Sequence, residues 1–310
     1  MDDFPRDLAE LERRFATEDA CHAYLVQLRW PEGFRCRRCG QAKAWPVRRL
    51  LLQCAACGHQ TSVTAGTIFQ DTRTPLTTWF RAMWWVTNQK TGVSALGLQR
   101  TLGLRSYKTA WSWLHKLRRA MVRPGRDRLT GRVEVDEAYI GGVHPGRGGR
   151  QTETKALVAV AVQVEARQRL GRIRLRRLLD ASGPSLTGFV QDAIEPGSLV
   201  HTDGWMGYEP LRRHGYRHRV TFLQGQAKSP SQLMPHVHQV VSLLKRWLLG
   251  THHGAVTHEH LDYYLDEFTF RFNRRRSRSR GKLFFRLAQQ AVAVDPAPYE
   301  SLVKYARFSS

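Results

Sequence analysis

Two aspartates occur in strand-like sequence, where their carboxylates could serve as metal ligands. In the run VEVDEAY, the alternation of a strand places Val133 and Val135 on one face and Glu134 and Asp136 on the other. Asp203 follows the apolar run SLVHT, so it lies at the carboxyl end of a predicted strand, a common place for sites in open α/β sheets. On neighbouring strands, the two aspartates could bind a divalent metal and leave positions for water and phosphate oxygens. Strand-terminal aspartates also serve as turn residues or caps, and this alternative stays open.

A histidine and a lysine share one face of a helix predicted over residues 236–249. The step from His238 to Lys245 is close to two helical turns, and Ser242 lies between them on the same face. A neutral imidazole can ligate a divalent metal, although it suits manganese better than magnesium. A lone histidine on a helix can equally be a packed or capping residue, so the residues alone leave both interpretations open.

Four of the five cysteines form two Cys-x-x-Cys pairs, each followed by a glycine. The pairs are Cys36 with Cys39 and Cys54 with Cys57, while Cys21 stands alone. In a reducing compartment, paired cysteines favour zinc over disulfides, and four thiolates suit one tetrahedral ion. The glycine after each pair permits a tight turn. The sequence therefore predicts a zinc ribbon with structural Zn²⁺, and it leaves open whether the ribbon also contacts DNA.

The charge balance predicts a polyanionic partner. The chain of 310 residues has 49 Lys and Arg against 26 Asp and Glu, a formal charge of +23. Such an excess favours nucleic acid, because each neutralised phosphate releases counterions. The sequence has no run of about 18 apolar residues and no lipidation signal, and its acidic start, MDDFPRDLAELERRF, fits neither a signal peptide nor a transit peptide. We therefore expect a DNA-binding protein without membrane contact that is cytoplasmic and nucleoid-associated.

The stretch TGVSALGLQRTLGLRSYKTAWSWLHKLRRAM predicts a helix-turn-helix. A short helix ends at a turn containing Gly103, and a second helix begins after Ser106, a plausible N-cap. Tyr107, Lys108 and Thr109 would then occupy the first turn, where a recognition helix meets base edges and phosphates, so we expect them and Ser106 to contact DNA. An ordinary helical hairpin is the alternative, and the strongly basic composition favours recognition.

The helices and strands that must position these residues fall into successive segments. We expect an N-terminal helical segment over 1–30, a zinc ribbon over 31–73, a helix-turn-helix over 74–123, a strand-rich domain over 131–285 and a C-terminal helical tail over 286–310. In the strand-rich domain, the runs VEVDEAYIGG, ALVAVAVQVE and IRLRRLL precede a helix-like SLTGFVQDAI, the strand SLVHTDGW and further helices, which predicts a mixed sheet in an α/β or α+β domain. The basic run that begins at Arg274 is either a solvated charge run or a DNA contact.

The order of these segments resembles the DDE-type transposases of bacterial insertion sequences, in the subgroup with an N-terminal zinc ribbon. The motifs that carry the resemblance are VDEAYIGG, HTDGWMGY, HVHQVVSLLKRWLLGTHHG and HLDYYLDEFTFRFNRRR, and it covers roughly residues 15–285. It implies a ribonuclease H-like catalytic core in which metal ions, normally magnesium, activate water or a DNA 3′-hydroxyl for in-line attack on a phosphodiester. The expected fold class is α/β, a ribonuclease H-like mixed sheet with flanking helices, preceded by the ribbon and the helix-turn-helix.

The resemblance also implies roles for individual residues. Asp136 matches the first acid of the family's motif and Asp203 the second. Many relatives have a third acid, a glutamate seven residues before a lysine; here that position is His238, and the subgroup fills it with Glu, Asn or His. The implied catalytic metal is Mg²⁺ or Mn²⁺, held by these three side chains. Lys245 is then expected to bind a DNA phosphate near the scissile bond, with a solvated surface lysine as the alternative. Arg274 is expected either to contact the DNA backbone or to cap the core.

These roles predict a transposase that binds the terminal inverted repeats of its element and then cuts and joins DNA ends. Its partners would be double-stranded DNA, both transposon ends and target. Two ends must be held together, so a homodimer or a higher synaptic oligomer is expected. If His238 is not the third ligand, Glu267 is the best substitute carboxylate, with Asp262 and Glu259 close by.

Two other functions fit the same sequence. The first is a zinc-ribbon and helix-turn-helix DNA-binding protein whose core is inactive. The second is a metal-dependent DNA nuclease, which would cleave DNA without joining a cut end to a target.

Overall fold

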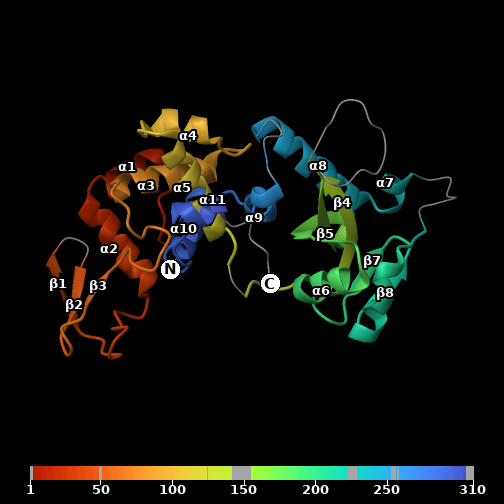
Figure 1. Cartoon of the computed structure of the whole chain (residues 1–310), viewed down its shortest axis with the longest axis horizontal. Coiled ribbons are helices and arrows are strands. Elements are labelled where there is room, and N and C mark those ends of the chain that lie inside the picture. Colours follow the sequence, from red (N-terminus) through yellow and green to blue (C-terminus); the bar gives the residue numbers. More distant parts are fainter. Residues whose placement is uncertain are drawn as a thin grey trace. The chain divides into compact units, whose positions relative to one another are not determined.

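The computed structural model describes residues 3–48, 51–123, 125–141, 155–222, 229–252, 256 and 258–304 (Figure 1). The chain divides into two compact units, one of Met1–Arg123 with Arg276–Tyr305 and one formed mainly by Pro124–Arg275. The first break falls at the start of the polar sequence RPGRDRLTG, residues 123–131. Among the described helices, none combines the length and the apolar composition needed to cross a membrane.

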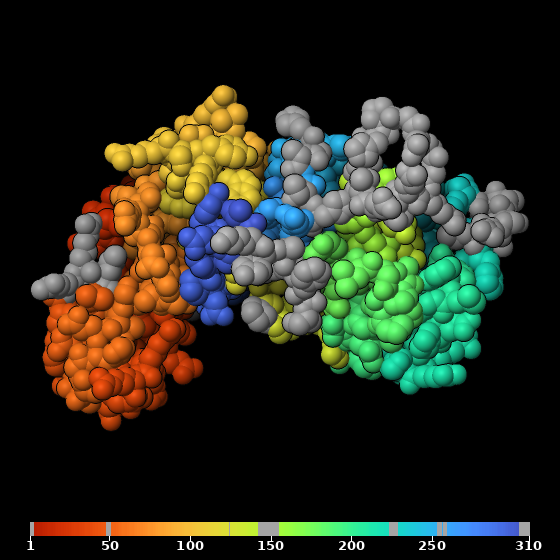
Figure 2. Space-filling model, in the orientation of Figure 1, coloured from red at the N-terminus to blue at the C-terminus, as the bar shows by residue number. Residues whose placement is uncertain are grey.

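The first unit combines a small sheet with a helical core. Its antiparallel sheet has the order β1-β2-β3, formed by β1 (Ala44–Arg48), β2 (Leu51–Cys54) and β3 (Gln60–Ser62). The helices are α1 (Leu8–Arg14), α2 (Glu18–Arg29), α3 (Leu76–Asn88), α4 (Ala95–Leu102), α5 (Tyr107–Ala120), α10 (Arg280–Ala291) and α11 (Tyr299–Lys304). Figure 2 shows the segment with the β1-β2-β3 sheet (red to orange) and α4 with α5 (yellow) on different sides of this unit.

Helix α10 packs in the aromatic core of the first unit. The Phe284 ring is fully buried, and its centroid lies 6.0 Å from that of Phe15, 5.6 Å from that of Phe80 and 6.0 Å from that of Trp84. Residues 276–285, which the sequence analysis joined to the strand-rich domain, therefore belong to the first compact unit. The cause is the apolar face of α10, which is buried against α2 and α3 rather than against the large sheet.

The second unit is built on a five-stranded mixed sheet with the order β6-β5-β4-β7-β8. Strands β4 (Arg132–Ile140), β5 (Ala156–Glu165) and β6 (Arg169–Leu178) are antiparallel, whereas β7 (Leu199–Thr202) and β8 (Arg217–Val220) run parallel to β4. The helical elements are η1 (Ala166–Gln168), α6 (Gly183–Ala193), η2 (Met206–His214), α7 (Pro230–Leu233), α8 (Pro235–His252), η3 (His258–His260) and α9 (Leu261–Asn273).

Helices cover both faces of this sheet, which explains why β5 reads as an unbroken apolar run. Val158, Val160 and Val162 pack in one cluster with α8 and α9, while Ala159 and Ala161 pack in the other with α6 and η2. Figure 1 shows α8 and α6 on opposite sides of the sheet. The mixed sheet between helices confirms the predicted α/β fold class and is consistent with a ribonuclease H-like core.

Candidate functional site

The sheet topology brings Asp136 and Asp203 together. The parallel pairing of β4 with β7 sets Glu134 opposite His201, so the same register continued by two residues sets Asp136 opposite Asp203. Asp203 lies directly after β7, where its Oδ1 atom accepts a hydrogen bond from the Trp205 backbone N–H (3.1 Å). The register thus sets Asp136 of β4 opposite the residue that follows β7, and the two carboxylates interact electrostatically.

The acids at this place are buried close to one another, and a bound cation would compensate their negative charge. Burial raises the pKa of Asp136 to about 7, and the nearby charges of Glu137 and Asp203 add to the shift. Burial also raises the pKa of Glu137, although the Tyr208 hydroxyl donates a hydrogen bond to Glu137 Oε2 (2.7 Å) and opposes the rise. The sequence did not suggest Glu137, because strand alternation places it on the other face of β4. Its position directly after Asp136 was the one indication that its charge would affect the site.

His238 lies beside this pair. Its Nε2 atom is 3.9 Å from Asp136 Oδ2, and its side chain is 29% exposed. Burial lowers the pKa of His238, against the opposing charges of Glu134 and Asp203, so the neutral imidazole is favoured. Nε2 is buried and has no hydrogen-bond partner among the described residues. A neutral ring nitrogen without a partner, next to two carboxylates, is an arrangement that a divalent cation would complete.

Glu134 positions the helix that carries His238. This carboxylate is fully buried and accepts hydrogen bonds from the backbone N–H groups of His236 (2.9 Å) and Val237 (3.1 Å) in the first turn of α8. Its other oxygen lies 2.7 Å from His236 Nδ1. Glu134 and Asp136 point to the same face of β4, so a helix held at Glu134 presents its next residues, including His238, to Asp136. Sequence reasoning placed Glu134 on this face but gave it no role.

The other predicted residues of the site lie in different surroundings. Lys245 is exposed on α8, two turns beyond His238. Glu267 is buried on α9 and pairs with Arg271, whose Nη2 atom lies 2.7 Å from Glu267 Oε1. Asp262 pairs with Arg177 of β6 at 3.2 Å, and Glu259 is exposed in η3. The structure therefore brings His238 next to Asp136, and pairs the substitute acids Glu267 and Asp262 with arginines.

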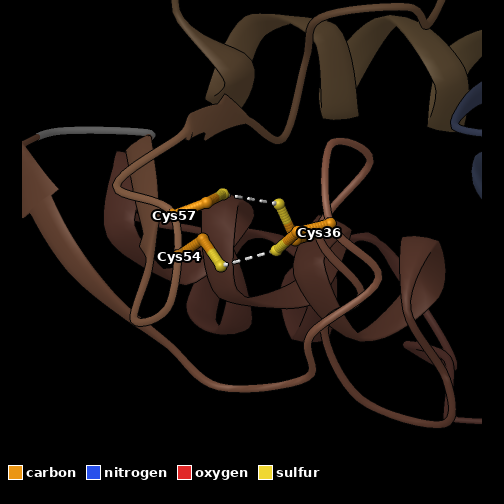
Figure 3. Close-up of side chains that lie close together, drawn as sticks. Cys36, Cys54 and Cys57 are labelled. Carbon is orange, nitrogen blue, oxygen red and sulfur yellow. Dashed lines mark hydrogen bonds between the residues drawn. The ribbon is translucent and has the colours of Figure 1, made fainter.

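The four paired cysteines form one cluster, and Figure 3 shows the side chains of Cys36, Cys54 and Cys57 pointing toward one another. The sulfur atoms of Cys36, Cys39, Cys54 and Cys57 all lie within 4.8 Å of one another, with 3.6 Å between Cys36 and Cys57 and 3.6 Å between Cys39 and Cys54. A tetrahedral zinc with bonds of about 2.3 Å sets its sulfur ligands about 3.8 Å apart. The hydrogen bond from the Cys57 backbone N–H, above all, lowers the pKa of Cys54 to about 6, which favours the thiolate. The cluster is a structural Zn²⁺ site.

The predicted helix-turn-helix segment forms two helices joined by a tight turn. Gly103 ends α4 in the left-handed region (φ 63°), and Ser106 caps α5 by accepting a hydrogen bond from the Thr109 N–H (3.1 Å), as predicted. Tyr107 and Lys108 are exposed in the first turn of α5. The Lys108 ammonium lies 3.9 Å from the centroid of the Tyr299 ring of α11, a cation–π contact that the sequence did not suggest.

Arg274 follows α9 and is partly buried. Its guanidinium lies 4.0 Å from the centroid of the Phe270 ring, and its Nη1 donates to the Phe270 carbonyl (3.3 Å). These contacts anchor the side chain at the end of α9.

Comparisons with known proteins agree with this arrangement. A family model described as "ISXO2-like transposase domain" matches residues 128–273, which include Asp136, Asp203, His238 and Lys245. A second, described as "Transposase zinc-ribbon domain", matches residues 16–60, which include the four clustered cysteines. A protein of Halobacterium salinarum described as "Uncharacterized protein in transposable element ISH50" is 26% identical over 278 residues, covering 84% of this chain and 92% of that protein.

Proposed function

The chain belongs to the insertion-sequence transposases that have an ISXO2-like transposase domain and an N-terminal zinc ribbon, and from this premise we propose that it cuts and joins DNA by the metal-dependent DDE chemistry. In this proposal Asp136, Asp203 and His238 hold a divalent metal, Mg²⁺ or Mn²⁺. The observation that carries it is the His238 Nε2 atom, which has no hydrogen-bond partner among the described residues, lies 3.9 Å from Asp136 Oδ2 and interacts electrostatically with Asp203. A metal bound there would polarise the phosphodiester and activate the attacking hydroxyl.

The residues of the chain prepare this site in several ways. Asp136 and Asp203 supply anionic oxygen ligands, and their mutual repulsion is relieved when a cation lies between them. Burial lowers the pKa of His238, which favours the neutral ring whose nitrogen can act as a ligand. Lys245 on the same helix would hold a DNA phosphate as a point charge, and Glu134 fixes the helix on which both residues stand.

The DNA contacts would come from both units. Ser106, Tyr107, Lys108 and Thr109 at the start of α5 are proposed to contact the terminal inverted repeats, together with the zinc ribbon. Lys245 would contact a DNA phosphate near the scissile bond, and Arg274 would contact the DNA backbone. Because transposition joins two ends to one target, the active species is proposed to be a homodimer or a larger synaptic oligomer, and its substrate would place it on the nucleoid.

The test is cleavage and strand transfer in vitro, with the element's own ends, in Mg²⁺ and in Mn²⁺. Asp136→Ala and His238→Ala are compared with the wild type and with Asp192→Ala, an exposed acid of α6 that pairs with Arg176 at 2.7 Å. We expect the wild type and Asp192→Ala to cut and join DNA, and both site variants to bind the ends without cutting them. All variants must retain zinc and thermal stability.

Each other outcome selects a different function. If Asp136→Ala fails but His238→Ala keeps full activity, the third ligand is wrong and Glu267 is next to be tested. Cleavage without joining would indicate the nuclease. If the wild type binds the ends but is inactive in both metals, the DNA-binding protein with an inactive core is the better description.

A further inference from the structure

The face of the sheet that carries the proposed metal ligands continues onto β8. The strand register sets Glu134 of β4, His201 of β7 and Arg219 of β8 in one row across the sheet. The neighbouring row, toward the start of β7 and β8, ends at Arg217. Paired residues of adjacent strands point to the same face, so both arginines share the face that presents Glu134 and Asp136.

The charges that act on His201 agree with this arrangement. Burial has the largest effect on the pKa of His201 and lowers it, while the carboxylate of Glu134 opposes the fall and the guanidinium of Arg219 adds to it. The imidazole is therefore within electrostatic reach of both side chains, as the register requires. Asp136 and Asp203 form the next row along the strands, so Arg219 lies one row from these acids.

The two arginines of β8 are open to solvent and unpaired. Arg217 and Arg219 are exposed, and neither guanidinium has a hydrogen bond or an ion pair with a described residue. Helix α8 packs against β4 and β5, whereas η2 packs beside β8 together with α6, on the other face of the sheet. Arg132 differs from the two, because its Nη2 atom lies 3.7 Å from Glu134 Oε1. The guanidiniums of β8 are therefore available to an anion, whereas that of Arg132 is engaged.

The type and spacing of these residues indicate which anion they bind. Charged residues also protect exposed strand edges from pairing, and β8 is an edge strand of its sheet (Figure 1). Either face would serve that purpose, yet Arg217 and Arg219 both lie on the face of the acids. They are about 7 Å apart along the strand, close to the spacing of neighbouring phosphates on one DNA strand. Each planar guanidinium can donate two parallel hydrogen bonds to a phosphate. Charge and spacing thus select a phosphate backbone.

We propose that Arg219 and Arg217 form a phosphate track, which binds the DNA strand beside the phosphodiester held at the metal site. This inference rests on the proposed function, since it takes DNA as the ligand and Asp136 with Asp203 as the place of cutting. With the reacting phosphate at these acids, the next phosphates of the same strand lie over Arg219 and then Arg217. The track fixes which phosphodiester reaches the acids, and it reads no base, because its contacts are to the backbone alone.

The test measures binding of duplexes of the element's end in the absence of divalent metal, so that nothing is cut. The β8 variant combines Arg217→Gln with Arg219→Gln. The matched η2 variant combines Arg212→Gln with Arg213→Gln, two exposed arginines of the element that packs on the other face of the sheet. Both variants lose the same charge, and zinc content, thermal unfolding and sedimentation serve as controls for folding and assembly.

Two measurements locate the contacts. The slope of log affinity against log salt should fall by about two in the β8 variant, one for each lost phosphate contact, and should stay close to the wild-type value in the η2 variant. Duplexes with a neutral methylphosphonate at one position at a time then show which phosphates matter. Two neighbouring substitutions on one strand should weaken binding by the wild type and the η2 variant, but not by the β8 variant. These positions should lie directly beside the phosphodiester that is cut in the cleavage assay.

Equal slopes for the β8 and η2 variants would overturn the track, because a general loss of positive charge would then explain both. So would a methylphosphonate profile that is the same in the β8 variant and the wild type, or a changed sedimentation coefficient of the β8 variant, which would place these arginines between copies of the chain. The cleavage assay is separate: a wild type that shows the two phosphate contacts but never cuts DNA contradicts the DDE chemistry alone. One that cuts DNA with a profile unchanged in the β8 variant contradicts the track alone.

Discussion

Asp136 is a buried carboxyl group whose ionisation depends on what lies beside it. Burial raises its pKa from 3.8 to about 7, and the neighbouring acids Glu137 and Asp203 add to the shift. A buried carboxylate among other acids lowers the free energy of unfolding unless a cation or a proton compensates its charge. In the proposed site, His238 would add a neutral nitrogen ligand to these acids.

The raised pKa of Asp136 predicts how the stability of the metal-free protein depends on pH. A pKa that is higher in the folded than in the unfolded state contributes stability below pH 3.8, and this contribution is lost as the pH rises to about 7. We therefore expect the free energy of unfolding to fall across this window, and Asp136→Asn to flatten the fall. Chemical denaturation at a series of pH values measures it, with Asp192→Asn as the exposed control. Parallel curves for the wild type and Asp136→Asn would contradict the prediction.

The identity of residue 238 predicts which metal the site prefers. An imidazole is an uncharged and softer ligand, so the wild type should bind Mn²⁺ more tightly than Mg²⁺. His238→Glu should shift the preference toward Mg²⁺, because it adds a third anionic oxygen. Titration calorimetry with each metal measures the two affinities directly. Unchanged metal preference in His238→Glu would place residue 238 outside the coordination sphere.

At the scale of elements, the site depends on the junction between β4 and α8. Glu134 lies on β4 and caps the first turn of α8. Its fully buried carboxylate accepts from two backbone N–H groups of that turn and also contacts the His236 ring nitrogen. The helix then packs through Val237, Val240 and Leu244 against the sheet. The position of His238 is therefore set at the first turn of α8 rather than by contacts of its own.

Replacing Glu134 should damage both stability and metal binding. Glu134→Ala leaves buried donors without an acceptor, so we expect a loss of about 3 kcal/mol in the free energy of unfolding. Glu134→Gln keeps an acceptor and should remain folded, but with Mn²⁺ affinity reduced about 10- to 100-fold, as for other residues that orient metal ligands. Denaturation and calorimetry measure the two effects. Glu195→Gln, at an exposed position, is the control, and an unchanged Mn²⁺ affinity in Glu134→Gln would refute the positioning role.

At the scale of the whole molecule, the formal charge of +23 should dominate DNA affinity. A protein that neutralises many phosphates loses affinity steeply as salt rises, and each contact contributes about one to the slope of log affinity against log salt. The zinc ribbon, the helix pair α4–α5 and the sheet of the second unit each carry part of this charge. Each of these DNA contacts is therefore expected to weaken as the salt concentration rises.

Lys245 offers a direct measure of this contribution. Lys245→Gln should weaken binding of the element's ends and lower the salt slope by about one, because a single phosphate contact is lost. Arg246→Gln is the matched control, since Arg246 is the next exposed residue on α8 but lies off the face shared by His238 and Lys245. Fluorescence anisotropy over a range of salt concentrations gives both slopes. Equal slopes for the wild type and Lys245→Gln would remove Lys245 from the DNA contacts.

Several features of this protein follow from its sequence alone, because they depend on neighbouring residues. Two Cys-x-x-Cys-Gly turns each supply two thiolates, Ser106 caps the helix that it precedes, and alternation assigns Glu134 and Asp136 to one face of a strand. The resemblance of the longer motifs then indicated the transposase family, which the family matches confirm.

Only the tertiary structure decided which distant residues meet. Glu134 and the first turn of α8 are 102 residues apart in the sequence, and Asp136 meets Asp203 only because β7 adds to β4 in parallel. The seating of Phe284 in the first unit is likewise settled by packing. Local periodicity shows which face of an element is apolar, but not which partner covers it, because that choice depends on the strand order and the shape of the whole core.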